Sequence, residues 1–410
     1  MSKTIIIGAG ASGLIAAIIA KRNNEDVLLL ERNTTCGKKL LITGNGRCNY
    51  FNDDQDLRHY HSSNKEVLKE IITSNNLNKV LEFFNSIGII PQIKNGYYYP
   101  YSNQAVSIQN SLLSEIKSLN IKVETNTYVK SVEHKNNKFL IKTDDKEIIA
   151  NKLIIATGSK SAPKTGSDGN GYDLAKKLGH SIIKPLPALV QLNINEPFLK
   201  EWSGIRANVS IKLIEDDKYI KQEQGEILLT NYGISGICVM QLSSKISRGL
   251  YEGKTEEVII NFLDGLISTR QEFIAFMNER DKKLPNRNIT QLLDSILNYK
   301  LINVLVKKSN LQTSKKWSQL SSKEKSVMAS NFIELRLKIT STNSFEKAQV
   351  TSGGVPLNEI NPLTLESTIV KKLYFAGEIL DVDGDCGGYN LTFAWISGIL
   401  TGSSRGNKND

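Results

Sequence analysis

Three glycines near the start of the chain have the spacing of a phosphate-binding turn. Gly8, Gly10 and Gly13 spell G-x-G-x-x-G between a β-branched run at 4–7 and a helical stretch at 14–22. In such a turn the first glycine permits the sharp bend, the second lets the backbone approach a pyrophosphate, and the third allows close helix–strand packing. The N-terminus of the helix would offer its N–H groups to the phosphates. An ordinary Gly-rich turn is the alternative.

An acidic residue follows the second apolar run, at the position that can contact the ribose of a nucleotide. The second apolar run, 27–30, ends in Glu31, 18 residues after Gly13. A carboxylate at the end of the second strand of a βαβ unit accepts hydrogen bonds from ribose hydroxyls. The strand, glycines, helix, second strand and acid therefore predict a unit that binds the ADP part of a dinucleotide.

The next segment favours FAD over NAD. Residues 43–49 read TGNGRCN, with two glycines and two asparagines in seven residues. This composition predicts a loop whose backbone comes close to a flat or anionic group, whereas a plain NAD dehydrogenase usually continues into a crossover helix. A surface turn is the alternative interpretation.

Two later blocks fit the same domain. Residues 121–158 predict strands around Val123, at 129–132 and at 139–143, with turns at Asn126 and at 136–137, and then a buried strand 153–156 ending in Thr157-Gly158. Near the C-terminus, a strand at 373–376 runs into Gly377-Glu378, a loop follows, and a helix is expected at 390–400. A carboxylate beside a helix N-terminus could hold ribitol hydroxyls and place positive dipole at the pyrimidine edge of a flavin.

At these blocks the chain resembles the BaiN-like, aminoacetone oxidase-like family of bacterial NAD(P)/FAD-dependent oxidoreductases. The resemblance covers almost the whole chain and is carried by KKLLITGNGRCN (38–49), GYYYPYSNQA (96–105), the ATG of 156–158, AGE (376–378) and GGYNL (387–391). The wider resemblance is to glutathione-reductase-like flavoproteins. It implies that the Glu of AGE contacts ribitol and that the last helix meets the flavin pyrimidine. Cys386 and Gln104 depart from the family, which usually has Thr and Lys there.

The motifs and the resemblance together predict a set of FAD-binding residues. These are Gly8, Gly10, Ala11, Ser12, Gly13, Glu31, Arg32, Lys38, Lys39, Leu40, Thr43, Gly44, Asn45, Gly46, Arg47, Asn49, Val129, Ala156, Thr157, Gly158, Gly377, Glu378, Gly388, Tyr389, Asn390 and Leu391. For the electrostatics around the flavin, the strongest candidates are Arg47, Asn49 and the amides of Asn390 and Leu391. A second G-x-G-x-x-G unit is missing, so NAD(P)H, if it is the reductant, is expected to visit the flavin only transiently.

The elements that must position these residues predict an α/β fold, a Rossmann-like FAD-binding domain of glutathione-reductase type. It would be formed by 1–188 and 356–410 and interrupted by an inserted β module (189–265), a nested basic helical subdomain (266–338) and a return strand (339–355). Strands are expected at 190–194, 208–214, 227–230 and 258–262, and helices at 268–277, 290–307 and 321–333. The resemblance implies a substrate cleft between insert and flavin domain.

The positive charge of the chain is concentrated in one window. The chain has 52 Lys and Arg against 42 Asp and Glu, a net charge of +10, and residues 280–338 alone carry +9. A basic helical module could bind RNA, DNA or an anionic substrate. It has few aromatic residues for base stacking, and a solvated lysine-rich face is the simpler interpretation.

Other chemistry is less well supported. Four scattered cysteines without a C-x-x-C pair fit neither a disulfide scaffold nor a zinc site, and favour a cytosolic protein. The apolar run 5–20 contains the three glycines and is short for a membrane span, so no membrane segment is expected. A Cys48–Cys386 redox disulfide is conceivable, although the short spacing of disulfide reductases is missing. Tyr97–Tyr99 could include a substrate-facing ring, with core packing as the equal alternative. His59 and His61 could face the cleft, but surface positions are favoured.

The sequence therefore predicts a cytosolic FAD-dependent oxidoreductase. Hydride would pass between a small organic substrate and flavin N5, and NAD(P)H or oxygen would complete the cycle. A reductase of an activated C=C bond and an amine or alcohol oxidase both remain open. The alternative is a flavin-containing nucleic-acid binder or redox sensor that uses the basic helical insert.

Overall fold

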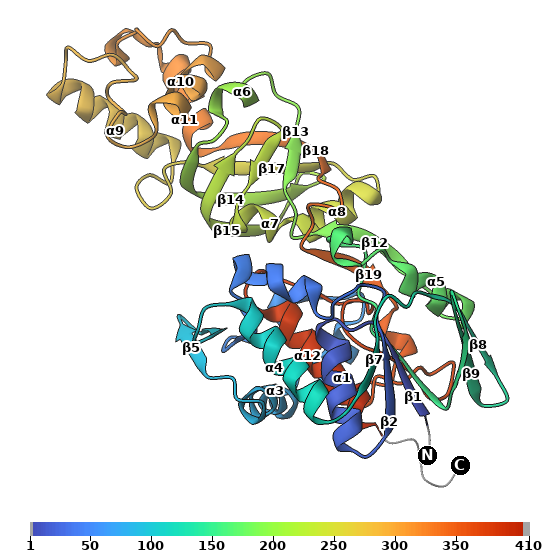
Figure 1. Cartoon of the computed structure of the whole chain (residues 1–410). Helices are drawn as coiled ribbons and strands as arrows, with labels where there is room; N and C mark the ends of the chain where they lie inside the picture. Colours follow the sequence, from blue (N-terminus) through green and yellow to red (C-terminus); the bar gives the residue numbers. More distant parts are fainter. Residues whose placement is uncertain (1–2, 405–410) are drawn as a thin grey trace. The chain divides into compact units, whose positions relative to one another are not determined.

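The computed structural model describes residues 3–404 and divides the chain into two compact units. One unit contains the residues up to Leu186 and those from Ala348 onward, and the other is Pro187–Lys347. Figure 1 shows that the first unit is built from both ends of the chain. The first unit has the predicted Rossmann-like α/β fold.

A five-stranded parallel sheet forms the centre of the first unit. Its order is β20 (Leu373–Phe375), β11 (Lys152–Ile155), β1 (Lys3–Ile7), β2 (Asp26–Leu30) and β7 (Lys122–Glu124). The three central strands, β11, β1 and β2, are almost wholly buried, as their continuous Ile, Leu and Val runs predict for strands covered on both faces. The carboxyl ends of all five strands therefore lie at one edge of the sheet, where ligands bind in this class of fold.

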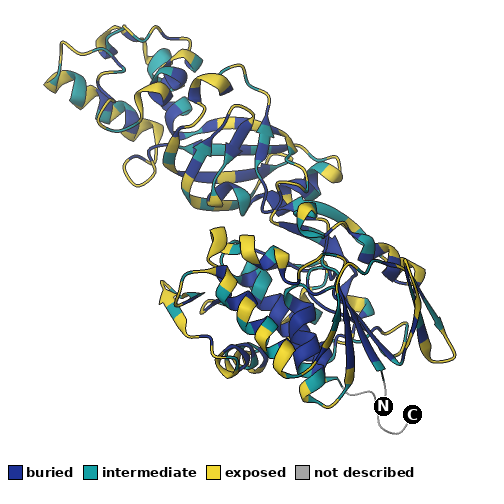
Figure 2. Cartoon of the chain, in the orientation of Figure 1, coloured by how far each residue is buried: buried dark blue, intermediate teal, exposed yellow. Residues whose placement is uncertain are grey.

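Two helices with small-residue contacts pack together in this unit. They are α1 (Ala11–Arg22) and α12 (Tyr389–Ser403), and α12 is mostly dark blue, meaning buried, in Figure 2. A Cβ on Gly398 would lie 2.6 Å from the Ser12 carbonyl oxygen, and one on Gly402 would lie 2.7 Å from that of Ala16. Glycine at these two positions lets the helix backbones approach closely. The N-terminal and C-terminal flavin-type segments are thereby joined in one core.

Smaller elements complete the first unit. A three-stranded antiparallel sheet of β8 (Val129–Lys135), β9 (Lys138–Thr143) and β10 (Glu147–Ala150) confirms the predicted meander, with Asn136 and Asn137 at positive φ in its first turn. A second three-stranded sheet has the order β3 (Phe51–Asn52), β6 (Tyr97–Pro100) and β5 (Pro91–Lys94), and β4 (Tyr60–His61) pairs with β21 (Asp383–Gly384). The helices are α2 (Lys65–Ile71), α3 (Ser74–Ser86), α4 (Ala105–Ser118) and α5 (Asn170–Lys177), and β12 (Ile183–Ala188) pairs with β19 (Val350–Gly354).

The second unit is a closed barrel with a helical extension. The barrel order is β13 (Leu192–Ile194), β16 (Gly233–Ser235), β15 (Lys218–Leu229), β14 (Arg206–Glu215), β17 (Glu256–Asn261) and β18 (Leu335–Thr342). Between β17 and β18 the chain forms α9 (Arg270–Lys283), α10 (Tyr299–Lys308) and α11 (Ser322–Ile333). Short helices α6 (Leu199–Trp202), α7 (Ile237–Met240) and α8 (Ser243–Tyr251) border the barrel strands.

One predicted helix is shorter than expected. The apolar spacing of 290–307 predicts a continuous helix, but α10 begins only at Tyr299, and residues 290–296 form turns. The Asn298 side chain accepts a hydrogen bond from the Lys300 backbone N–H, and so caps α10 at this point. Asn is a strong N-cap residue, and here its capping bond overrides the apolar periodicity.

Candidate functional site

The glycine turn after β1 has the packing that a dinucleotide site requires. A Cβ on Gly13 would lie 1.9 Å from the Gly8 carbonyl oxygen, and one on Gly8 would lie 2.5 Å from that of Ala156. A Cβ on Gly10 would meet nothing within 4 Å. The absence of side chains at Gly8 and Gly13 therefore lets α1 pack close to the sheet, whereas Gly10 faces open space. Helix α1 begins after Gly10 without a side-chain cap, so its first N–H groups are available to an anion.

Glu31 is buried beside this turn. Its Oε2 accepts a hydrogen bond from the Ala9 backbone N–H at 2.8 Å, and its Oε1 accepts two bonds from Asn33 at 2.8 Å. A carboxylate has about four lone-pair sites, two on each oxygen, so Oε2, which accepts one bond here, can also accept from a ribose hydroxyl. Arg32, the next residue, forms an ion pair with Asp168 and lies over the Tyr128 ring. The fold therefore holds the Glu31 carboxylate beside the glycine turn.

The TGNGRCN run forms an irregular loop, as its composition predicts. Its first part belongs to the 3-10 segment η1 (Lys38–Gly46), which is broken at Thr43, Gly44 and Asn45. Gly44, Asn45 and Cys48 have φ of 54°, 55° and 58°. The left-handed backbone turns the chain back on itself, and Arg47 lies exposed with its guanidinium 5.3 Å from the centre of the Tyr99 ring.

An ion pair joins this loop to the C-terminal block. Lys39 Nζ lies 2.7 Å from Glu378 Oε2 and 2.6 Å from Ser161 Oγ. Glu378 Oε1 accepts further hydrogen bonds from Ser161 Oγ and from the Thr351 backbone N–H. Both residues were expected at the cofactor, and the structure places them in one contact network that links η1, the segment after β11 and the end of β20.

The N-terminus of α12 carries a second potential ligand surface. Gly388 is its N-cap with φ of 95°, no side chain caps the helix, and its first turn has no acidic residue. Asn49 Oδ1 is buried and has no hydrogen-bond partner among residues 3–404, and it lies 3.1 Å from the position of a Cβ on Gly388. A buried amide oxygen without a partner is costly, so this acceptor beside free helix N–H groups indicates a bound polar ligand.

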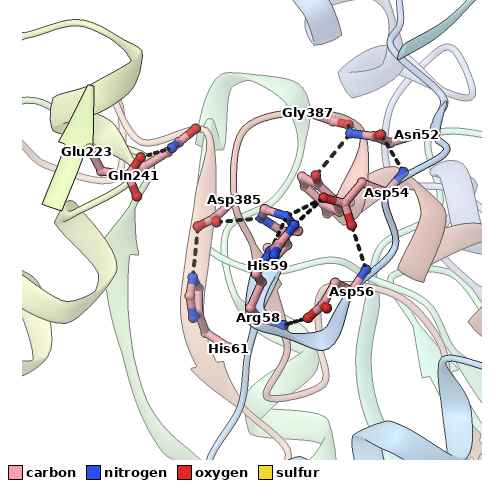
Figure 3. A network of polar contacts seen from close by, with 12 residues as sticks. Asn52, Asp54, Asp56, Arg58, His59, His61, Glu223, Gln241, Asp385 and Gly387 are labelled. Atoms are coloured by element: carbon pink, nitrogen blue, oxygen red, sulfur yellow. Dashed lines mark hydrogen bonds and ion pairs between the residues drawn. The ribbon is translucent and has the colours of Figure 1, made fainter. Parts of the chain in front are cut away.

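Figure 3 shows a polar network that the sequence did not predict. Asp385 accepts from two histidines, since its Oδ2 lies 3.1 Å from His59 Nδ1 and its Oδ1 lies 3.0 Å from His61 Nε2. The other ring nitrogen of His59 lies 3.1 Å from Asp54 Oδ2. The histidine side chains are only 22% and 18% exposed. Surface positions were expected, but both rings are half-buried. His59 ends the 3-10 segment η2 (Leu57–His59), His61 lies in β4, and the pairing of β4 with β21 brings both to the loop before α12.

The same network fixes the side chains around Gly387. Asn52 Nδ2 donates to the Gly387 carbonyl oxygen and to the Tyr389 hydroxyl, both at 3.0 Å. The His59 ring stacks on the Tyr389 ring at 4.6 Å between centroids. Tyr97 is 37% exposed, and its ring lies 3.0 Å from the position of a Cβ on Gly387. Of the three tyrosines at 97–99, Tyr97 is thus the best placed to meet a ligand.

The cysteines do not form the considered redox disulfide. None of Cys36, Cys48, Cys238 and Cys386 forms a disulfide. Burial raises the pKa of Cys48 to about 12 and that of Cys36 to about 11, so both thiols stay protonated at neutral pH. Among residues 3–404 there is also no cluster of three or more metal-ligating side chains, and none of the helices there is long and apolar enough to cross a membrane.

Part of the positive charge of the basic window is paired with acidic residues of its own unit. Lys307 Nζ lies 2.7 Å from Glu201, Lys308 Nζ lies 3.4 Å from Glu196, and Lys315 Nζ lies 2.9 Å from Glu324. Over the whole of 187–347, 23 Lys and Arg stand against 18 Asp and Glu, a net charge of +5. The excess is therefore about half of what the 280–338 window alone suggests.

Comparisons with known proteins cover almost the whole chain. Residues 2–404 match the family model described as HI0933-like protein Rossmann domain. The chain is 38% identical over 405 residues to a 3-dehydro-bile acid delta(4,6)-reductase of Clostridium scindens, covering 98% of both chains. It is 29% identical to a ribosomal RNA dihydrouridine synthase of Escherichia coli, covering 96% of this chain and 95% of that one. A flavocytochrome c3 fumarate reductase structure aligns with 98% of this chain and 77% of its own, with a TM-score of 0.49 and 13% identity.

Proposed function

The chain belongs to the HI0933-like family and is an FAD-dependent oxidoreductase, and we propose that it reduces a C=C bond conjugated to a carbonyl group. NAD(P)H is the proposed reductant. The observation that carries the proposal is the 38% identity to a delta(4,6)-reductase over 98% of both chains. The two relatives described above give no comparable support to the amine and alcohol oxidase interpretations.

Both curated relatives act, by name, on the same kind of bond. A 3-dehydro-delta(4,6) bile acid contains a dienone, and uridine contains a ring C=C bond conjugated to a carbonyl. Dihydrouridine is the product in which that bond is saturated. The two relatives share a reaction type although their substrates differ. The reaction type is therefore a firmer inference for this chain than either substrate.

The residues of the first unit fit FAD. The amides after Gly10 would hold the pyrophosphate, Glu31 the ribose, and the N-terminus of α12 with Asn49 Oδ1 the polar edge of the flavin ring. The fit rests on two uncapped helix N-termini, the open space at Gly10 and the buried acceptor of Asn49. When bound, FAD would supply the hydride that the substrate carbon receives.

A second candidate substrate is a uracil base in RNA. The net charge of +5 on 187–347 and the E. coli relative favour it. Phosphate contacts by Lys and Arg would supply affinity. The internal ion pairs of Lys307, Lys308 and Lys315 count against a dedicated phosphate-binding face, so the small-molecule enone remains the main proposal.

Anaerobic mixing tests the proposal in two steps. The FAD-loaded protein is mixed with NADH or NADPH, and we expect one of them to bleach the flavin. Cyclohex-2-enone and a steroid 4-en-3-one are then added as probes, and at least one should restore the flavin colour with formation of the saturated ketone. Bleaching by amines or alcohols, with no response to either enone, would overturn the proposal in favour of an oxidase.

A further inference from the structure

We propose that His61 donates the proton that must accompany hydride transfer, and that Asp385 holds His61 in the orientation for this step. The inference rests on the proposed function, because saturation of an enone needs one hydride and one proton. The hydride enters at the carbon β to the carbonyl, and the α-carbon takes the proton. A positioned side chain that supplies this proton is a general acid.

One ring nitrogen of His61 is hydrogen-bonded to Asp385, and the other is open to a ligand. Its Nε2 lies 3.0 Å from Asp385 Oδ1, and its Nδ1 has no hydrogen bond to any of residues 3–404. A carboxylate on one ring nitrogen fixes the ring and favours a proton there, which directs the other nitrogen to a reacting group. Figure 3 shows His61 at the end of the network, with Asp385 between it and His59.

The opposite end of the network reaches solvent. His59 connects Asp385 to Asp54, which forms a second contact with Arg58 at 2.6 Å. The Asp54 and Arg58 side chains are 47% and 66% exposed, whereas the Asp385 side chain is only 6% exposed. The hydrogen-bonded chain from Asp54 through His59 and Asp385 to His61 therefore leads from the surface to a buried carboxylate and to one open imidazole nitrogen.

The position of Asp385 connects this chain to the cofactor site. Asp385 lies three residues before Gly388, the N-cap of α12, and Asn52 fixes the intervening loop by its bond to the Gly387 carbonyl oxygen. In the fit described above, the α12 N-terminus meets the flavin. A proton donor oriented by Asp385 is thus built into the segment that leads directly into that helix end.

The proton balance closes without a further reactant. Protonated His61 carries one proton on each nitrogen, and it transfers the Nδ1 proton to the α-carbon as the hydride reaches the β-carbon. His61 is left neutral with its Nε2–H bonded to Asp385. Solvent water then restores the lost proton at Nδ1, the nitrogen that is not bonded to Asp385. The substrate gains two electrons and two hydrogens, and NAD(P)H provides the electrons.

Tyr389 is the competing donor in this region, and its contacts argue against it. Its hydroxyl accepts from Asn52, its ring is buried under His59, and burial raises its pKa above the ordinary value for tyrosine. Tyr389 is therefore held as part of the frame around Gly387, and these contacts favour His61 over Tyr389 as the proton donor.

The experiment separates the two half-reactions in His61→Asn, Asp385→Asn and the control His134→Asn. His134 packs on Phe139 in β8, outside the network. All three should bind FAD and be bleached by NAD(P)H at near wild-type rates. Reoxidation by the enone should slow about 100-fold in the His61 and Asp385 variants and remain unchanged in the control. Added imidazole should partly restore His61→Ala.

A second measurement, which does not depend on turnover, distinguishes a loss of His61 orientation from a folding defect. In the FAD-free protein, imidazole ¹⁵N NMR of the four histidines should show His61 protonated at Nε2, and Asp385→Asn should remove that preference. A wild-type reoxidation rate in His61→Asn, or no Nε2 preference in the wild type, would overturn the proposal. Failure of every enone to reoxidise the wild-type flavin would instead overturn the proposed function.

Discussion

Lys39 and Glu378 form an ion pair of 2.7 Å although 339 residues separate them in the chain. The pair joins the loop after β2 to the end of β20, two segments expected at the cofactor. Both side chains are largely shielded from solvent, and Glu378 is also held by Ser161 and Thr351. The ion pair therefore belongs to the frame on which FAD would rest.

Removing the lysine should weaken cofactor binding. In Lys39→Met, Glu378 loses its cation, and leaving a shielded charge unpaired costs about 1–3 kcal/mol. We expect FAD affinity to fall about tenfold in a titration followed by flavin fluorescence. Lys69→Met is the matched control because Lys69 is exposed and lies outside the predicted FAD-binding set, and it should bind FAD as the wild type does. Equal losses in both variants would show that general charge, and not this ion pair, supports binding.

Two glycine variants should separate folding from binding. A Cβ at Gly13 meets the Gly8 carbonyl at 1.9 Å, so Gly13→Ala should lower the stability of the FAD-free protein by about 1–3 kcal/mol or more. Gly10 faces open space, so Gly10→Val should leave the thermal midpoint of the FAD-free protein nearly unchanged. Its side chain would occupy the pyrophosphate position, and FAD affinity should fall more than about tenfold, or about 1.4 kcal/mol. A stable Gly10→Val protein with normal FAD affinity would place the cofactor elsewhere.

The stability of the second unit should depend on the protonation of Glu256. Burial, with Glu215 nearby, raises the pKa of Glu256 from about 4.5 to about 8. Between these values the folded chain binds a proton that the unfolded chain has lost. The free energy of unfolding must therefore decrease as pH rises from about 5 to 8. Glu256→Gln should remove this decrease and be more stable than the wild type at pH 8, by roughly 1 kcal/mol or more.

Urea unfolding at pH 5, 6.5 and 8 measures this effect. The control is Glu279→Gln, whose side chain forms an exposed ion pair with Lys283. Its pH dependence should follow that of the wild type. If wild type and Glu256→Gln keep a constant difference across the three pH values, Glu256 is not protonated in the folded protein.

RNA binding, if it occurs, should depend on the lysines that lack acidic partners. Lys282, Lys300 and Lys323 have no ion pair within residues 3–404, whereas Lys307, Lys308 and Lys315 do. Replacing the first three by Ala should reduce the slope of log affinity against log salt by about 3, one for each lost phosphate contact. The paired three should change it less. Equal effects of both triple variants would mean that the ion pairs open on binding.

The sequence predicted the parts of this site that are local in the chain. G-x-G-x-x-G, Glu31 and the TGNGRCN loop each lie within a few residues of the elements that position them, so their spacing was sufficient. The His59–Asp385–His61 contacts join residues more than 320 positions apart, and neither side carries a motif. The same holds for the charges. The ion pair of Lys307 with Glu201 could not be predicted, because the two residues lie far apart in the sequence. The helix predicted over 290–298 does not form, because the Asn298 cap makes α10 begin at Tyr299 despite the apolar spacing before it.

A single anaerobic turnover tests the central claim most directly. The FAD-loaded protein is reduced with one equivalent of the preferred nicotinamide, mixed with a steroid 4-en-3-one, and followed by flavin absorbance and by mass analysis of the product. The account predicts that the oxidised flavin spectrum returns while one equivalent of the saturated ketone forms. A flavin that stays reduced with enones and with uridine-containing RNA, and that is reoxidised only by oxygen, would contradict it.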